Sequence, residues 1–210
     1  MIETAVRQAI KSLNDVRQHF GLVWAVDELF FEEWSCELPE LSDRDIAKLD
    51  QLRDRLDYHL DSGKVDEGIV NVLVVSPLLE MAGLYDSPFR IRSEVPVVIE
   101  SQVQQENLRG RIDFLVIHNQ LWRGIIESKE TTFDVNTAIP QALAYMAGVD
   151  TKLPTYGLVT NGVSFVFLKV VQGETKRFDL SDVIARRSRT NSLYQVLQIL
   201  KSIASQIQVP

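Results

Sequence analysis

The sequence of 210 residues contains one cysteine and no long apolar run. The single Cys36 excludes an internal disulfide and any metal site built from cysteines. No stretch approaches the roughly 18 uncharged apolar residues that a membrane-spanning helix needs. The first residues include the acids Glu3 and Asp15 and lack a basic start followed by an apolar run, which argues against a secretory signal. A soluble, cytoplasmic protein is therefore expected.

The composition is that of an ordinary globular protein, because 45% of the residues are hydrophobic and 24% are charged. The net charge is -7, and residues 1–62 carry all of it, with 14 acids against 7 bases. Such acidity disfavours non-specific nucleic-acid binding, which depends on attraction to phosphates. The neutral remainder can still hold a local basic groove. The basic run at residues 186–189 is one candidate, and a solvated loop or helix end is the alternative interpretation.

The chain is expected to divide at about residue 62. Residues 1–62 form an acidic helical module, in which residues 3–33 have a helical pattern and residues 42–60 form an amphipathic helix. Ser42 is the expected N-cap of that helix, with Asp45 three residues later. No chemistry is apparent in this module, so we expect it to serve in docking or dimerisation.

Residues 63–210 are expected to form an α/β (α+β) domain. Their pattern predicts helices and strands in an order typical of a mixed central sheet flanked by helices. The expected elements are a helix at 66–81 kinked by Pro77, strands at 89–100, 111–117 and 122–128, a helix at 137–149, a hairpin of strands 155–160 and 164–170 around Asn161–Gly162, and a helix at 192–207. A polar loop is expected at residues 101–108.

Two carboxylates and one lysine stand out in the strands. Asp113 lies inside the second strand, and Glu127 and Lys129 lie at the end of the third. Residues two apart in a strand share a face, so Glu127 and Lys129 point the same way and Ser128 points to the opposite face. If the two strands pair as a hairpin, Asp113 comes close to Glu127.

This constellation suits metal-assisted hydrolysis of a phosphodiester. One or two carboxylates are enough to hold Mg²⁺, which keeps several waters and favours oxygen ligands. Lys129 can orient an attacking water or stabilise developing negative charge, and its pKa is expected to fall through burial and repulsion by the cation. The alternative is an ordinary exposed strand end. Both acids lie among apolar residues, where an unpaired charge is costly, and this favours the functional interpretation.

The pattern resembles the PD-(D/E)xK nuclease superfamily, which has the restriction-endonuclease-like fold. Asp113 and the segment Glu127-Ser128-Lys129 match its central motif, although Ile112 replaces the usual proline. The segment Gln141-Ala142-Leu143-Ala144-Tyr145 resembles the Gln-x-x-x-Tyr helix motif of RecB-type nucleases, and Gly110 also suits that branch.

Two further segments extend the resemblance. Glu67 is similar to a helix glutamate that often adds a metal ligand, and it is preferred to its rival Glu80 because it opens the helix. Residues 156–165 resemble a strand-turn-strand of the N-terminal nuclease domain of type I restriction enzyme R subunits. The resemblance covers residues 64–170, and residues 1–62 have no recognised counterpart.

The resemblance implies a Mg²⁺- or Mn²⁺-dependent nuclease that hydrolyses DNA, of the restriction or DNA-repair type. Its implied catalytic residues are Asp113, Glu127, Lys129 and Gln141, its metal ligands are Glu67, Asp113 and Glu127, and its substrate-binding residues are Tyr145 and Arg111. The main alternative is an inactive nuclease-fold protein that binds nucleic acid or protein as an accessory. A third is an interaction protein that uses its N-terminal helices to form a homodimer or to bind a restriction or repair partner.

Overall fold

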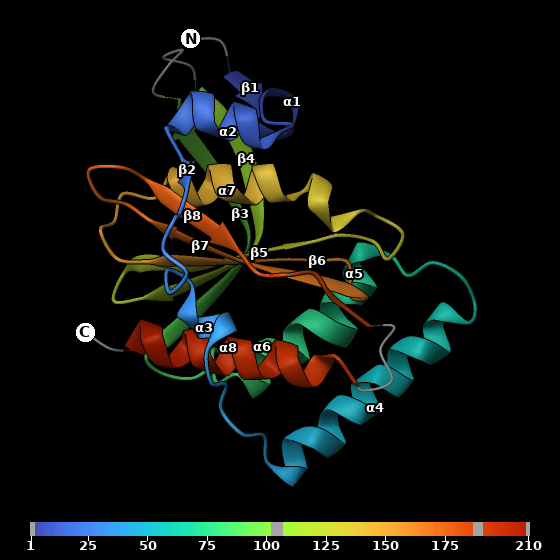
Figure 1. Cartoon of the computed structure of the whole chain (residues 1–210). Coiled ribbons are helices and arrows are strands. Elements are labelled where there is room, and N and C mark those ends of the chain that lie inside the picture. Colours follow the sequence, from blue (N-terminus) through green and yellow to red (C-terminus); the bar gives the residue numbers. More distant parts are fainter. Residues whose placement is uncertain (1–2, 102–106, 187–190, 209–210) are drawn as a thin grey trace.

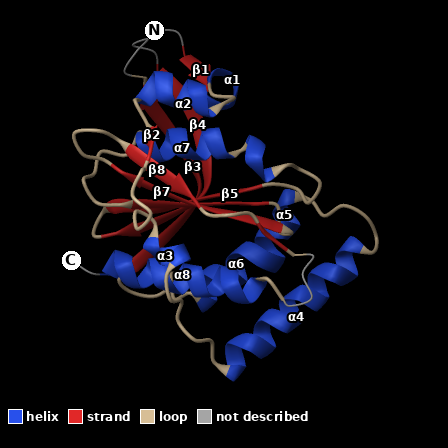
Figure 2. Cartoon of the chain, in the orientation of Figure 1, coloured by secondary structure: helices blue, strands red, loops and turns tan. Residues whose placement is uncertain are grey.

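The computed structural model describes residues 3–101, 107–186 and 191–208, in which a mixed sheet lies between two groups of helices (Figures 1 and 2). The helices are α1 (Val6–Ala9), α2 (Leu13–Phe20), α3 (Glu32–Ser35), α4 (Asp43–Leu60), α5 (Glu67–Val70), α6 (Ser76–Met81), α7 (Ile139–Ala147) and α8 (Leu193–Gln208). The strands are β1 (Glu3–Ala5), β2 (Val23–Trp24), β3 (Phe89–Glu100), β4 (Asn107–His118), β5 (Leu121–Ser128), β6 (Thr155–Thr160), β7 (Ser164–Val171), β8 (Arg177–Leu180) and β9 (Ile184–Ala185). Most of the expected polar loop and of the basic run at 186–189 lies outside the described residues.

The sheet runs in the order β1-β4-β5-β6-β7-β8-β2, with β3 paired to β4 and β9 paired to β7. A two-residue turn joins β4 and β5, and its residues Asn119 and Gln120 both have positive φ, as the tight turns of β-hairpins require. Strands β5 and β6 are parallel, so they need the crossover connection that contains α7. The mixed sheet is confirmed, and the elements expected from residue 66 onwards are present in the expected order, with two additional short strands, β8 and β9, between β7 and α8.

Two separate apolar cores hold the helices against the sheet. Helices α1, α2 and α7 contribute to one core, and α4, α5, α6 and α8 contribute to the other. In Figure 1, α2 and α7 accordingly lie on one side of the strands, and α6 and α8 lie on the opposite side. The architecture is the α/β arrangement of a mixed central sheet flanked by helices that the sequence predicts.

The front of the chain differs from the separate helical module expected for residues 1–62. Strand β1 pairs with β4 and β2 pairs with β8, so this segment extends both ends of the sheet path. Its apolar residues also divide between the cores, since Val16 enters the core with α7 while Leu49 enters the other. The helix expected at 42–60 is confirmed with its reciprocal Ser42–Asp45 cap, whereas the helical pattern of residues 3–33 yields only the short helices α1, α2 and α3. A docking or dimerisation role of residues 1–62 stays a prediction.

The helix expected at 66–81 is present but contains a π-helical stretch at Asn71–Val75, between α5 and α6. This widened turn comes just before Pro77, which has no N–H and whose ring crowds the preceding helical turn. The local π geometry therefore accommodates the proline where a kink was expected. No helix of the described residues is long and apolar enough to cross a membrane.

Candidate active site

The β4–β5 hairpin brings Asp113 and Glu127 together, as the sequence predicts. Phe114 pairs with Ile126, and the same antiparallel register places Asp113 beside Glu127. Both carboxylates are buried, with exposures of 6% for Asp113 and 2% for Glu127. Two carboxylates therefore share a site of low solvent access, where their charges repel each other.

Ser128 holds Asp113 in place, contrary to the expectation that it points to the other face. Its backbone N–H donates to Asp113 Oδ2 at 2.7 Å, and its hydroxyl donates to the same oxygen at 3.0 Å. Ser128 is the last residue of β5, so the strict alternation of strand side chains ends there. The only sequence signal that could have predicted the contact between Ser128 and Asp113 is that this serine is the last residue of the strand.

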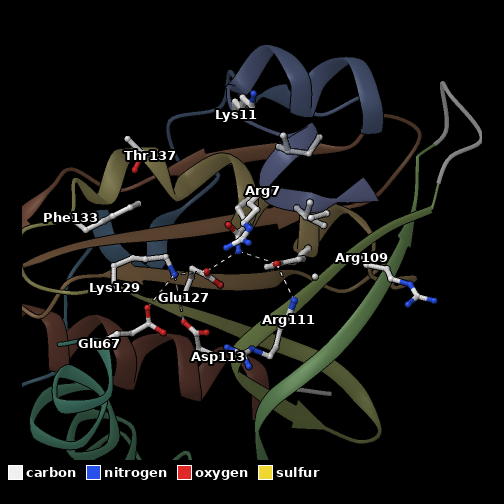
Figure 3. A pocket seen from close by; sticks show the side chains of 16 residues that line it. Arg7, Lys11, Glu67, Arg109, Arg111, Asp113, Glu127, Lys129, Phe133 and Thr137 are labelled. Carbon is white, nitrogen blue, oxygen red and sulfur yellow. Dashed lines mark hydrogen bonds and ion pairs between the residues drawn. The ribbon is translucent and has the colours of Figure 1, made fainter. Parts of the chain in front are cut away.

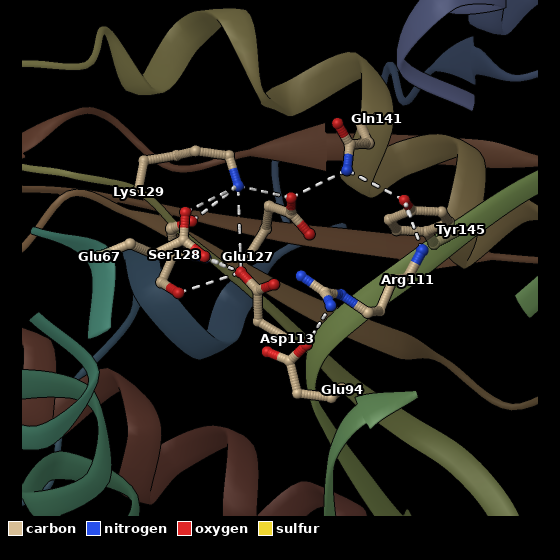
Figure 4. A network of polar contacts seen from close by, with 9 residues as sticks. All are labelled: Glu67, Glu94, Arg111, Asp113, Glu127, Ser128, Lys129, Gln141 and Tyr145. Atoms are coloured by element: carbon tan, nitrogen blue, oxygen red, sulfur yellow. Dashed lines mark hydrogen bonds and ion pairs between the residues drawn. The ribbon is translucent and has the colours of Figure 1, made fainter. Parts of the chain in front are cut away.

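Lys129 extends from the end of β5 into the middle of an oxygen cluster (Figure 4). Its Nζ donates to Glu127 Oε1 and to the Ser128 carbonyl oxygen, each at 2.7 Å. The same nitrogen lies 3.9 Å from Glu67 Oε2 and 4.0 Å from Asp113 Oδ2. The structure thus brings together Asp113, Glu127, Lys129 and, at a greater distance, Glu67.

Helix α7 adds Gln141 and Tyr145, which lie one turn apart. Gln141 Nε2 donates to Glu127 Oε1 and to the Tyr145 hydroxyl oxygen, both at 2.9 Å. The backbone N–H of Arg111 donates to the same hydroxyl oxygen at 3.3 Å. Burial and the charge of Glu127 raise the pKa of Tyr145 to about 12, so this phenol stays protonated at neutral pH. The two helix residues therefore fix the orientation of Glu127.

The remaining predicted residues lie at the edge of the cluster. Glu67 opens α5 and its side chain is 40% exposed. Its rival Glu80 instead lies 3.8 Å from Lys48 on α4, away from the cluster, which supports the preference for Glu67. The guanidinium of Arg111 forms an ion pair with Glu94 at 2.7 Å. Glu94, which sequence reasoning missed, lies opposite Asp113 in the β3–β4 register and has a φ of 53°.

Burial dominates the electrostatics of the site. It raises the pKa of Glu127 from 4.5 to about 7, and the neighbouring charge of Asp113 adds to the effect. Burial also raises the pKa of Glu67. For Lys129, burial opposes the charged form, but the charge and hydrogen bond of Glu127 outweigh it and the pKa is raised. The carboxylates of Glu127, Asp113 and Glu67 are the charged neighbours that raise it, and the fall expected beside a bound cation stays a prediction.

The donor set fits a hard divalent cation. Among the described residues, Glu127 Oε2 is a buried oxygen with no hydrogen-bond partner, and the strand register places Glu127 opposite Asp113. The ammonium of Lys129 already holds a cationic position among these oxygens. Within the described ranges, no three acidic, histidine or cysteine side chains are arranged as a ready set of metal ligands. Mg²⁺ keeps several waters, so Asp113 and Glu127 meet its requirement.

These residues form one end of a pocket of about 770 Å³ (Figure 3). Glu67, Asp113, Glu127, Lys129, Gln141 and Tyr145 all line it. The pocket also includes Arg7 and Lys11 from the front of the chain, which sequence reasoning did not select. No local motif marks these two residues, because only the pairing of β1 with β4 brings them to the site.

Comparison with known proteins gives a family match over most of the chain. The family described as type I restriction enzyme R protein N terminus matches residues 1–176. The match includes residues 1–62, for which sequence reasoning found no counterpart. A solved structure, described as a fragment of an HsdR subunit of a type I restriction enzyme from Vibrio vulnificus YJ016, is similar over 69% of this chain, at 17% identity and a TM-score of 0.42. The matched region spans 26% of that chain, about a quarter of its length. Among curated proteins, no significant match is found.

Proposed function

The chain belongs to the family described as type I restriction enzyme R protein N terminus, and on this basis we propose that it is a Mg²⁺-dependent nuclease that hydrolyses DNA phosphodiester bonds. The observation that carries the proposal is the convergence of Asp113, Glu127 and Lys129 in one pocket, with Gln141 bonded to Glu127. We further propose that the protein acts within a multi-subunit restriction system. The family match is what supports DNA as the proposed substrate and restriction subunits as the proposed partners.

Each residue has a proposed role that its contacts support. Asp113 and Glu127 hold the cation, Mg²⁺ or Mn²⁺, and Glu67 assists at the edge of the site. The bound cation would polarise the phosphoryl group and lower the pKa of water. Gln141 keeps Glu127 in one orientation through its hydrogen bond to Oε1. Its second hydrogen bond, to the Tyr145 hydroxyl, holds Gln141 itself in place. A fixed carboxylate needs no reorganisation when charge develops during reaction.

In this proposal the Lys129 ammonium has two successive partners, the Glu127 carboxylate and the substrate phosphate. In the structure its ammonium neutralises Glu127, with Nζ 2.7 Å from Oε1. With a cation bound at Glu127, the Lys129 ammonium would lie beside a second positive charge and would instead donate to the phosphate oxygens that gain negative charge. The lysine thus stabilises the free site and afterwards provides a donor for the substrate.

A cleavage assay tests the proposal. The purified chain is incubated with plasmid or single-stranded DNA and Mg²⁺ or Mn²⁺, and we expect product only with the cation. Glu127→Gln and Lys129→Ala should each lower the rate by about 100-fold or more. Glu174→Gln and Lys152→Ala make the same changes at exposed positions outside the pocket and should leave the rate unchanged.

The same assay includes the result that would overturn the proposal. If the wild-type chain does not cleave DNA, or if Glu127→Gln cleaves as fast as Glu174→Gln, the nuclease proposal fails. Calorimetry with Mn²⁺ then identifies the alternative. A chain that neither cleaves DNA nor binds the cation would favour the alternative of a nuclease-fold accessory that binds nucleic acid or protein.

A further inference from the structure

We infer that the N-terminal segment of residues 3–11 is the phosphate-binding wall of this pocket. The side chains of Arg7 and Lys11 would contact the phosphate backbone of the DNA. The inference rests on the proposed function, because it takes DNA as the substrate. It assigns the binding of that DNA to a segment separate from the strands that carry the carboxylates. The wall and the carboxylates border the same cavity, since the pocket lined by Asp113 and Glu127 is also lined by Arg7 and Lys11.

The fold holds this segment firmly against the site. Strand β1 pairs in parallel with β4 and places Ala5 beside Arg109, close in sequence to Asp113. Directly after Ala5, Val6 and Ile10 are buried in the core shared with α7, with exposures of 1% and 3%. Lys11 is fixed through its backbone N–H, which donates to Asp15 Oδ2 at 2.9 Å. The side chains of Arg7 and Lys11 therefore project from an anchored backbone.

The side chains of Arg7 and Lys11 lie on the side of this anchored segment that lines the pocket. Arg7 and Lys11 each follow a buried apolar residue, and both are exposed at the pocket. In Figure 3, Lys11 lies on the side of the N-terminal helices, and Glu67 and Asp113 lie on the opposite side. The pocket thus has a cationic wall and an acidic floor, an arrangement that matches a phosphodiester placed between them.

The charges of Arg111 and Lys129, which also line the pocket, are already engaged. Arg111 pairs with Glu94 at 2.7 Å, and Lys129 pairs with Glu127. Within the described part of the chain, the side chains of Arg7 and Lys11 form no hydrogen bond or ion pair. Two cations without a counter-ion in a concave site attract an anion, and the phosphate backbone of DNA supplies a row of them.

The distribution of charge in the front segment agrees with this role. Residues 1–20 carry three bases and two acids, whereas residues 21–62 carry four bases and twelve acids. The acidic character therefore begins after the segment that reaches the pocket. A negatively charged chain that must bind DNA needs its cations at the site itself, and Arg7 and Lys11 meet this need.

Binding of DNA by the full chain tests the inference without any cleavage. Fluorescein-labelled single-stranded and duplex oligonucleotides are titrated in EDTA, with anisotropy as the readout, between about 50 and 200 mM salt. We expect Arg7→Ala/Lys11→Ala to weaken binding about tenfold or more at the lower salt. The slope of log K against log salt should also fall by about 1.4 for single strands and about 1.8 for duplex, as loss of two phosphate contacts requires.

Two control variants separate local contacts from net charge and from misfolding. Arg17→Ala/Lys152→Ala removes two exposed bases outside the pocket and should keep both the affinity and the slope. Arg7→Lys/Lys11→Arg keeps both charges and should restore most of the binding. Circular dichroism of each variant confirms the fold.

The outcomes distinguish this inference from the proposed function. If the wild type cleaves DNA but Arg7→Ala/Lys11→Ala binds it as tightly as Arg17→Ala/Lys152→Ala, the wall is refuted and the nuclease stands. If the wild type binds DNA through Arg7 and Lys11 but never cleaves it, the wall stands and the nuclease is refuted. Equal losses in both double variants also refute the wall, because general charge then explains the binding.

Discussion

Gly110 provides the space that Tyr145 occupies: a Cβ atom at Gly110 would lie 2.4 Å from the Tyr145 hydroxyl oxygen and 2.5 Å from its ring carbon Cε1. Tyr145 is almost fully buried and is held by Gln141 and by the backbone of Arg111. A strand residue without a side chain is thus what lets helix α7 approach β4. The orientation of Glu127 depends on this close contact through Gln141.

Gly110→Ala should therefore damage both stability and cleavage. The added methyl group displaces the Tyr145 ring, and overpacking of this kind costs about 1–3 kcal/mol of the free energy of unfolding. We expect cleavage at saturating Mg²⁺ to fall about tenfold or more, as Gln141 loses its contact with Tyr145. Urea denaturation and the plasmid assay measure the two effects. Gly173→Ala adds the same group where the nearest atom is 3.9 Å away, and equal behaviour of the two variants would refute the argument.

Lys129→Met should separate metal binding from cleavage. Its ammonium contacts Glu127 Oε1 and so competes with a cation for that carboxylate. Removing the positive charge should tighten Mn²⁺ binding by roughly tenfold, or about 1.4 kcal/mol, while cleavage falls about 100-fold. Titration calorimetry with Mn²⁺ measures the affinity, with Lys152→Met as the exposed control. Weaker Mn²⁺ binding in Lys129→Met than in wild type would show that the ammonium does not compete.

The grouping of Asp113, Glu127, Lys129 and Gln141 could be predicted because its causes are local. A short turn joins the two strands, alternate residues share a face, and Gln141 and Tyr145 are one helical turn apart. The Asn161–Gly162 hairpin was predictable for the same reason, since Gly162 has a φ of 82° that suits glycine.

The contribution of residues 1–62 to the sheet could not be predicted, because it depends on distant partners. Strand β1 has three residues and β2 has two, too few for an alternating pattern to appear. Their strand conformation comes from pairing with β4 and β8, which lie more than a hundred residues away in sequence. The same holds for the placement of Arg7 and Lys11 at the pocket.

A buried ion pair between Glu33 of α3 and Lys169 of β7 supplies another test of that long-range packing. Lys169 Nζ donates to both carboxylate oxygens at 2.7 and 2.8 Å, and the Tyr156 hydroxyl donates to Oε1 at 2.6 Å. Lys169→Met leaves the Glu33 carboxylate buried without its cation and should cost about 3–5 kcal/mol of the free energy of unfolding. Urea denaturation measures the loss, with Lys152→Met as the exposed control.

The second substitution in this pair checks the cause of that loss. Glu33→Gln/Lys169→Met removes the uncompensated charge while an amide still accepts the Tyr156 hydrogen bond, so it should be more stable than Lys169→Met alone. If the double variant is equally unstable, lost packing of the lysine side chain rather than the buried charge explains the effect.

The raised pKa of Glu127 predicts how stability depends on pH when no divalent cation is present. Burial first, and then the charge of Asp113, raise this pKa from 4.5 to about 7, so between these pH values the folded chain binds a proton that the unfolded chain has released. The free energy of unfolding gained from Glu127 is therefore fully present below about pH 4.5 and is lost as pH rises to about 7, by an amount on the order of 3 kcal/mol. Urea denaturation in EDTA at about pH 5 and pH 8 measures it, and Glu127→Gln, which cannot titrate, should lose less stability across this range than wild type. If wild type and Glu127→Gln lose the same stability between these pH values, a group other than Glu127 is responsible. A smaller loss of stability in Glu127→Gln would show that the Glu127 carboxylate is the titrating group.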